Sequence, residues 1–121
     1  MRALLAVLIW AVVVPLTTQA QSIDGDLILK PRWLRPDFSP QAFYPPRAQV
    51  LHQTGAAKVR CEVSQTDTLA NCQVLSEAPT GFGFGEALLK VSSRLHMEHL
   101  DGDGRPVEGR PVEVKMDFTL R

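Results

Sequence analysis

Four segments of this chain show a regular spacing of apolar residues. Residues 57–63 and 70–76 alternate apolar and polar side chains, which is the period-2 pattern of half-buried strands. Residues 84–95 carry an apolar stripe at helical spacing, and residues 112–120 alternate again without a break. The stripe consists of Phe84, Ala87, Leu88, Val91 and Leu95. The pattern predicts two strands, a helix and a third strand.

The first two strands are predicted to form a hairpin around the two cysteines of the chain. If Cys61 lies opposite Cys72, one register pairs all the inner residues, and Thr66-Asp67 is the turn. The other pairs are Val63 with Ala70, Val59 with Val74, and Ala57 with Ser76. A cross-strand disulfide would then fix the register; two buried free thiols are the alternative.

A short helix is predicted before the hairpin. Tyr44-Pro45-Pro46 can open it, because proline is tolerated in the first turn. Residues 47–54 would carry Ala48, Val50 and Leu51 on the apolar side, and Gly55 fits a left-handed cap.

The segment ahead of this helix has no periodicity. Prolines 31, 36 and 40 block a long helix, so we interpret residues 21–42 as an extended leader and residues 43–121 as the domain. The apolar residues near the leader would either dock on the domain as a strap or form an aromatic patch for a ligand. They are Trp33, Leu34, Phe38 and Phe43.

The order helix, strand, strand, helix, strand predicts a small α+β domain. Its three-stranded antiparallel sheet should have the order 2-1-3, with two helices packed on one face. The last strand is then an edge, and also the longest strand. Edge strands pair with other chains unless they are blocked. The residues of this edge are Val112, Glu113, Val114, Lys115, Met116, Asp117, Phe118, Thr119 and Leu120.

The first 20 residues predict export. Arg2, the apolar run 3–16 and the small residues around Ala20 have the order of a signal peptide cut after Ala20. An uncleaved membrane anchor is the alternative, but the run has 14 residues where a spanning helix needs about 20. Export favours a disulfide over free thiols.

Charge excludes some partners. The whole chain has 13 basic and 13 acidic side chains, and removal of residues 1–20 takes away Arg2 alone. Such a balance predicts neither nucleic acid nor an anionic membrane surface as a partner.

Candidate chemistry is weak. The glycine-rich stretch 81–85 matches no phosphate-binding motif, so we interpret it as the start of a helix. His96 and His99 lack a third metal ligand, and the calcium-like Asp101-Gly102-Asp103-Gly104 lacks the later oxygen ligands, which favours a turn. We therefore expect no enzyme, metal or cofactor; loss of an activity on substituting His96 or His99 would favour the enzyme hypothesis.

Several of these features together resemble the C-terminal domain of TonB proteins. They are Tyr44-Pro45, Ala48 and Gly55, the hairpin, the helix 84–95, Gly104-Arg105-Pro106-Val107 and the final alternating strand. The match covers about two thirds of the chain, residues 43–121. The cysteine pair, Ser76-Glu77-Ala78-Pro79 and Gly83-Phe84-Gly85 resemble a branch of secreted single-domain chains.

The resemblance implies a function in envelope energy transduction. TonB C-terminal domains capture the TonB box of an outer-membrane receptor, and here that segment would add as a strand to residues 112–120. The implied location is the periplasm, and Glu113, Lys115, Asp117 and Thr119 would flank the incoming peptide. An envelope adaptor or cell-wall-associated domain without a transport role is the alternative. The open edge also allows a strand-exchanged homodimer.

Overall fold

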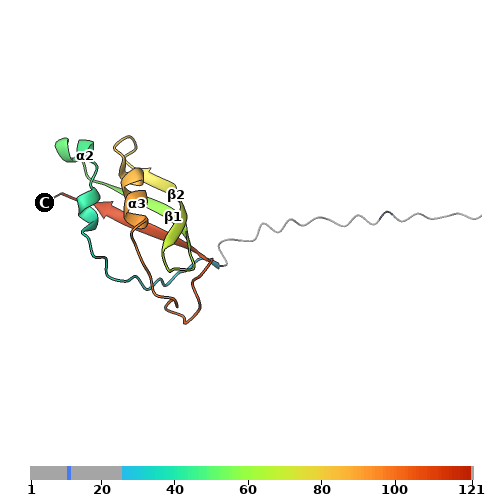
Figure 1. Ribbon diagram of the computed structural model, residues 1–121. Helices are drawn as coiled ribbons and strands as arrows, with labels where there is room; N and C mark the ends of the chain where they lie inside the picture. Colours follow the sequence, from blue (N-terminus) through green and yellow to red (C-terminus); the bar gives the residue numbers. More distant parts are fainter. Residues whose placement is uncertain (1–10, 12–25, 121) are drawn as a thin grey trace, which may run out of the picture.

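A three-stranded antiparallel sheet with the order β2-β1-β3 forms one layer of the protein, and helices form the other (Figure 1). The computed structural model describes residues 11 and 26–120. The strands are β1 (Gly55–Val63), β2 (Leu69–Ala78) and β3 (Pro111–Phe118), and the helices are η1 (Pro40–Phe43), α2 (Pro46–Val50) and α3 (Phe84–Ser92). The predicted α+β class and sheet order are confirmed. The predicted signal peptide lies outside the described residues, apart from residue 11.

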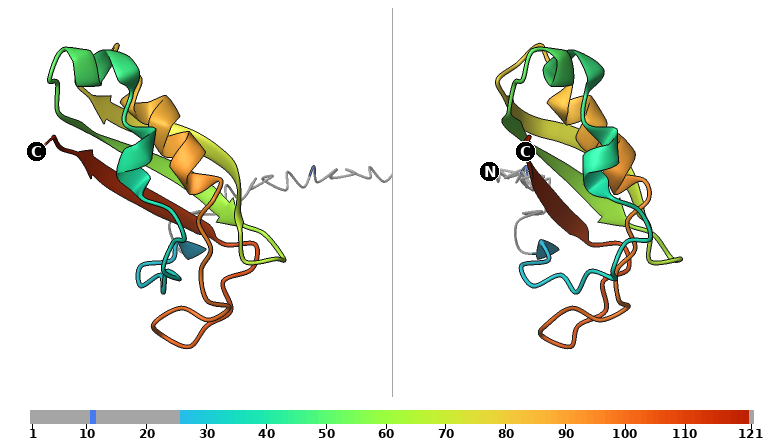
Figure 2. Two further views of the ribbon diagram at one scale, coloured as in Figure 1. Left: turned by 60° about the vertical axis from the view of Figure 1, so that its left-hand side comes forward. Right: turned by 90° about the vertical axis from the view of Figure 1, so that its left-hand side faces the viewer.

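The core lies between α3 and one face of the sheet, and the other face is open (Figure 2). Phe84 and Leu88 of α3 are fully buried, as the helical stripe predicts. At one end of the core, the ring of Phe84 packs against Phe118 and Tyr44, with centroids 5.1 and 5.9 Å away. These rings join α3, the end of β3 and the segment before α2, so they fix the two layers relative to one another.

Several predicted boundaries are wrong. β1 begins at Gly55 rather than at residue 57, and β2 spans Leu69–Ala78 rather than 70–76. β3 ends at Phe118, so Thr119 and Leu120 lie beyond the strand. β2 has 10 residues and β3 has 8, so the last strand is not the longest. α3 ends at Ser92 rather than at residue 95, although Leu95 still packs partly buried against the core.

The predicted hairpin register holds in the middle of the hairpin and is wrong toward both ends. Val59 pairs with Val74 as expected, but Val63 pairs with Leu69 and Ala57 with Glu77. β2 contains two bulges: Asn71 and Cys72 together oppose Cys61, and Leu75 is an extra residue between two pairs. Asn71 has a φ of 52°, a left-handed conformation that asparagine tolerates and that allows the bulge. The expected disulfide between Cys61 and Cys72 is present, with the Cα atoms 4.0 Å apart.

The hairpin turn is a five-residue loop, not the two-residue turn predicted at Thr66-Asp67. Ser64 and Thr68 close it through a backbone hydrogen bond of 2.8 Å, and their hydroxyl groups lie 2.7 Å apart. Asp67 supplies the left-handed residue, with a φ of 62°. Serine and threonine hydroxyls stabilise such a loop without a glycine.

The short helix α2 is shorter than predicted. Ala48 is buried, but Val50 and Leu51 are 76% and 55% exposed, so their assignment to a buried side is wrong. The chain turns after five residues because the Gln53 N–H donates to the Ala48 carbonyl and the Tyr44 hydroxyl donates to the Gln53 carbonyl.

Gly55 has a different role from the predicted helix cap. His52 takes the left-handed conformation, with a φ of 53°, and Gly55 begins β1. A Cβ atom on Gly55 would lie 2.4 Å from the Phe84 ring. Glycine therefore allows close packing between β1 and that ring.

The described part of the leader, residues 26–42, docks on the domain. Four backbone hydrogen bonds hold it: Ile28 to Pro111, Gly102 to Lys30, Glu98 to Arg32, and Leu34 to His96. The buried side chain of Ile28 adds an apolar contact. The leader thus passes from the start of β3 across the loop after α3 and reaches η1, on the helix-bearing side of the sheet (Figure 2).

Candidate functional site

The outer edge of β3 carries backbone groups that have no partner within the described residues. The Val63 N–H donates to the Arg110 carbonyl at 3.0 Å, which fixes the phase of the β1–β3 ladder. Since alternate residues of an antiparallel strand point both backbone groups at the neighbour, the even-numbered residues 112–118 bond β1. Glu113, Lys115 and Asp117 therefore point their N–H and C=O groups away from the sheet.

Two contacts mark the ends of this open stretch. The Ile28 N–H donates to the Pro111 carbonyl at 2.9 Å, and the Gln41 amide lies 3.5 Å from the Asp117 carbonyl. Between them, both backbone groups of Glu113 and Lys115 and the N–H of Asp117 have no partner among residues 26–120. The five residues from 113 to 117 span about 14 Å. This edge can pair with a short extended segment.

The two edges of the sheet differ in regularity. All eight residues of β3 pair with β1 without a shift, whereas the pairing of β2 shifts at two bulges. Bulges twist an edge and interrupt the row of free donors and acceptors, which protects it from pairing. β3 is therefore the edge on which a further strand would fit.

The open face beside this edge is charged. Glu113 accepts a hydrogen bond of 2.8 Å from Arg60 and lies 3.5 Å from Lys58. The Arg60 hydrogen bond, aided by the nearby charges of Lys58 and Arg60, holds the pKa of Glu113 below its ordinary value. Glu113 is thus a fixed anion that already has cationic partners on β1.

Lys115 and Asp117 are exposed on the same face and form no ion pair within residues 26–120. Lys115 lies directly opposite Lys58 in the register. Like charges across a strand pair repel, so Lys115 favours an anionic neighbour on its free side.

An apolar groove runs beside the edge, on the helix side of the sheet. It has a volume of about 360 Å³, and its walls come from the leader, from α3 and the turn after it, and from β3. Its lining residues are Trp33, Leu34, Pro36, Pro40, Gln41, Leu88, Val91, Leu95, Val114, Lys115 and Met116. We call this the leader groove. The leader groove borders the middle of the open stretch of β3, because Lys115 lines the groove and also belongs to that stretch.

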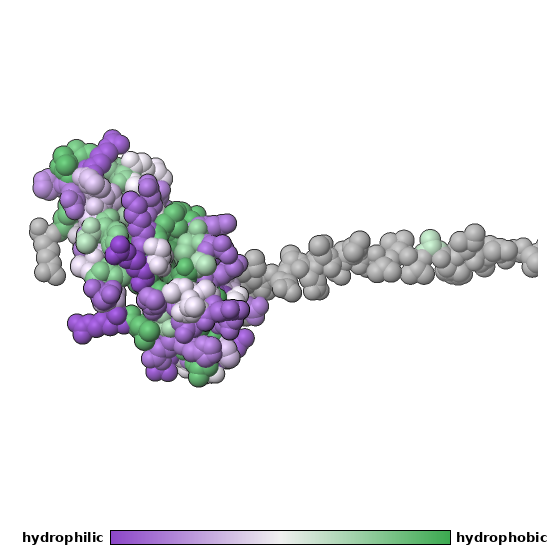
Figure 3. Space-filling view, in the orientation of Figure 1, coloured by the Kyte–Doolittle hydropathy of each residue, from purple (hydrophilic) through white to green (hydrophobic). Residues whose placement is uncertain are grey.

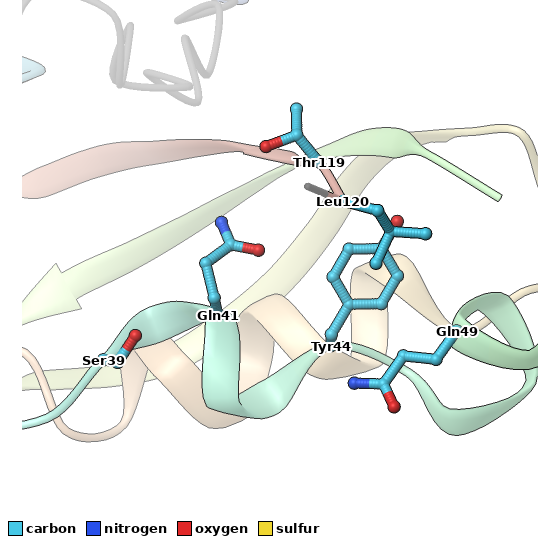
Figure 4. Close-up of a pocket in the computed structure, with 6 residues that line it drawn as sticks. All are labelled: Ser39, Gln41, Tyr44, Gln49, Thr119 and Leu120. Carbon is cyan, nitrogen blue, oxygen red and sulfur yellow. The ribbon is translucent and has the colours of Figure 1, made fainter. Parts of the chain in front are cut away.

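A polar hollow of about 530 Å³ lies at the far end of β3 (Figure 4). Gln41 and Tyr44 point toward the end of the strand, where Leu120 also lines the hollow. Burial raises the pKa of Tyr44, so its phenol remains a neutral donor to the Gln53 carbonyl. The lining residues are Ser39, Gln41, Tyr44, Gln49, Thr119 and Leu120.

The histidines and the calcium-like loop do not form a metal centre in the part of the chain that the structure describes. His99 lies 3.5 Å from an Asp67 oxygen, and His96 is exposed. The Asp101 side chain closes its own turn: it accepts from the N–H groups of Asp103 and Arg105 and pairs with Arg110 at 2.9 Å. The Asp101 side chain therefore stabilises the conformation of this loop.

The sequence predicted the edge residues but missed the leader groove. The edge residues are brought together as one strand, except for Thr119 and Leu120. The sequence signal for the groove was the set of apolar residues in the leader. In the structure, Trp33 and Leu34 of that set remain 37% and 43% exposed. Seen from the side of Figure 1, apolar surface occurs in separate patches among polar residues (Figure 3). Within residues 26–120, no helix has the length and apolar character required to cross a bilayer.

Comparison with known proteins identifies the fold. The structure is similar to the solution NMR structure of the Pseudomonas aeruginosa TonB CTD, with a TM-score of 0.56 and 20% sequence identity. The similarity covers 77% of this chain and 89% of that chain. No protein-family model and no curated protein sequence matches the chain. The chain therefore has a fold like that of the TonB C-terminal domain.

Proposed function

We propose that this protein is a periplasmic, TonB-like domain that binds segments of outer-membrane receptors by adding them as a strand to β3. It would belong to the secreted branch with a cysteine pair and act in TonB-dependent transport. The observation that carries the proposal is the regular edge of β3, where both outward backbone groups of Glu113 and Lys115 and the N–H of Asp117 lack partners among residues 26–120. The fold likeness and the predicted export signal support it. The proposed action is binding, without a catalytic step.

Amide exchange tests the proposal at single residues. In the free protein, the amides of Val114 and Met116 should exchange slowly, because they bond β1, and those of Lys115 and Asp117 should exchange fast. Addition of a synthetic TonB-box peptide should protect Lys115 and Asp117 and shift the resonances of residues 112–118. Protection in the free protein at low concentration would overturn the proposal, whereas protection that grows with protein concentration would indicate the homodimer.

A proline substitution tests the edge directly. Lys115→Pro removes the outward N–H of residue 115 and leaves the hydrogen bonds to β1, so peptide binding should be lost while the domain remains folded. Lys115→Ala is the matched control, because it removes the same side chain and keeps the N–H. Equal peptide binding by wild type and Lys115→Pro would reject strand addition.

An envelope adaptor without a role in transport is the second candidate. One observation favours it: hydrogen bonds hold residues 28–34 against the domain. A transducer needs instead a free chain that can extend across the periplasm. The adaptor would use the same edge for another partner. Capture of an envelope protein that Lys115→Pro abolishes, together with no binding of TonB-box peptides, would favour the adaptor over the receptor-binding function.

A further inference from the structure

The leader groove lies where the side chains of an added strand would arrive. Cross-strand neighbours share a face of the sheet, so residues opposite Val114 and Met116 would point to the helix side. Both of these β3 residues line the leader groove. The residue between them would pair with Lys115 and point to the open, charged face. One short segment would therefore present alternate side chains to two different surfaces.

The leader groove favours apolar side chains on a bound segment, because most of its lining residues are apolar. Val91 and Leu95 form its wall on the helix side, and Trp33 and Leu34 close it from the leader. Its volume of about 360 Å³ is at the small end of the range for ligand pockets, about 300–1,000 Å³. Trp33 is held in place because its neighbours Arg32 and Leu34 hydrogen-bond the backbone of Glu98 and His96. The groove is thus a positioned surface, which reduces the entropy cost of binding.

The open face calls for an acidic side chain between the two apolar ones. Lys115 is exposed, faces Lys58 across the β1–β3 pair, and has no ion-pair partner within residues 26–120. Two acids flank Lys115 on this face of β3: Glu113 is already bonded to Arg60 and Lys58, and Asp117 forms no ion pair with Lys115 within residues 26–120. An acidic residue on the incoming strand would therefore meet an unneutralised cation.

From these three observations we infer that β3 and the leader groove together select an extended partner segment with the order apolar–acidic–apolar, and that the leader is part of the binding site. The inference rests on the proposed strand addition and adds to it the chemistry of the partner. The pattern reads the same in both directions, so it holds for parallel and antiparallel addition. Contact with about five residues of the partner fits the open stretch from 113 to 117.

Three seven-residue synthetic peptides test the inference with the full chain. The first is Thr-Thr-Leu-Asp-Leu-Thr-Thr. The second, Thr-Leu-Thr-Asp-Thr-Leu-Thr, has the same composition but places leucine and aspartate on one face. The third replaces the aspartate of the first by lysine. We expect the second to bind about tenfold more weakly than the first, and the third about fivefold more weakly.

Protein variants separate the groove from the edge. Trp33→Ala should weaken the first peptide about tenfold and reduce its preference over the second. Leu29→Ala is the control, because Leu29 is also an apolar leader residue, is 78% exposed and does not line the groove. Lys115→Glu should reverse the preference between the first and third peptides. Thermal unfolding of each variant checks that the domain is folded.

The outcomes distinguish the two proposals. Equal binding of all three peptides, lost in Lys115→Pro but not in Trp33→Ala, would keep strand addition and overturn the inference. Binding of the first peptide that survives Lys115→Pro would overturn both, because the inferred site requires a paired strand. Binding lost in Lys115→Pro, weakened by Trp33→Ala and unchanged in Leu29→Ala would support both.

Discussion

Replacement of the Cys61–Cys72 disulfide by alanines should cost this domain a large share of its stability. The bond closes a loop with a sequence separation of 11. In the chain-entropy model, a loop of this length restricts the unfolded chain enough to contribute about 3 kcal/mol. Small domains typically have a total of about 5–15 kcal/mol, so the loss would be substantial. Alanine is the right replacement, because Cys61 is 1% exposed and a serine would bury a hydroxyl group.

Urea unfolding of the double variant Cys61→Ala/Cys72→Ala measures this contribution. With a slope of about 1.5 kcal/mol per molar urea, the midpoint should fall by about 2 M relative to the oxidised wild type. The slope itself should rise, because an unfolded chain without the cross-link exposes more surface. A fall of less than about 0.5 M would refute the loop-entropy argument and would mean that the hairpin is held by packing alone.

The same variant also tests whether the disulfide acts on the binding edge. The bond joins β1 to β2, whereas β3 lies on the other side of β1. Amide exchange at Lys115 and Asp117 in the folded variant should therefore remain fast, and peptide binding should be unchanged. Loss of binding in a folded variant would indicate that the two sides of the sheet are coupled.

Three further substitutions test the packing and the loop. Gly55→Ala should destabilise the domain by about 1–3 kcal/mol in urea unfolding, because the new Cβ would lie 2.4 Å from the Phe84 ring; an unchanged midpoint would contradict this. Ser92→Ala should stabilise it by about 1 kcal/mol, since the buried Ser92 hydroxyl has no hydrogen-bond partner among the described residues; a loss of stability would indicate a hidden partner. Asp101→Asn should lower stability at neutral pH: the Arg105 N–H, with help from Arg110, holds the pKa of Asp101 below its ordinary value. This stabilisation is present above the ordinary carboxyl pKa and is lost as the pH falls through the lower folded value, so the wild-type and variant melting temperatures should converge in acid.

The core could be predicted because burial leaves a direct mark on the sequence. Val112, Val114 and Phe118 alternate with exposed residues along β3, and Phe84, Leu88 and Val91 follow the helical period along α3. Each period is a consequence of backbone geometry, so it identifies both the element and its buried side. The connection order then limits the sheet to few topologies.

The hairpin register could not be predicted from the same kind of pattern. Ala70, Cys72, Val74 and Ser76 look like one face of a regular strand, but two extra residues interrupt the ladder between them. A bulge depends on a local backbone state, here the left-handed conformation of Asn71, and asparagine has no fixed preference for it. The predicted length of helix α2 was wrong for a related reason. The Tyr44 hydroxyl donates a hydrogen bond to the Gln53 carbonyl, and no periodicity in the sequence reveals such a contact.

Of the candidate site, the edge could be predicted from the sequence and the leader groove could not. The edge follows from strand order, and the sequence therefore predicts it. The leader groove depends on where residues 28–34 dock, and backbone hydrogen bonds such as that from Leu34 to His96 hold them there. Since every residue has a backbone carbonyl, and every residue other than proline has a backbone N–H, these bonds leave no mark in the sequence. The one sequence signal was that Trp33 and Leu34 are too apolar for a free tail, and their side chains remain partly exposed after docking. A segment added to the unpaired strand would cover the apolar surface that stays accessible beside it. The exposed apolar side chains of the leader and the open edge of β3 would therefore bind the same partner.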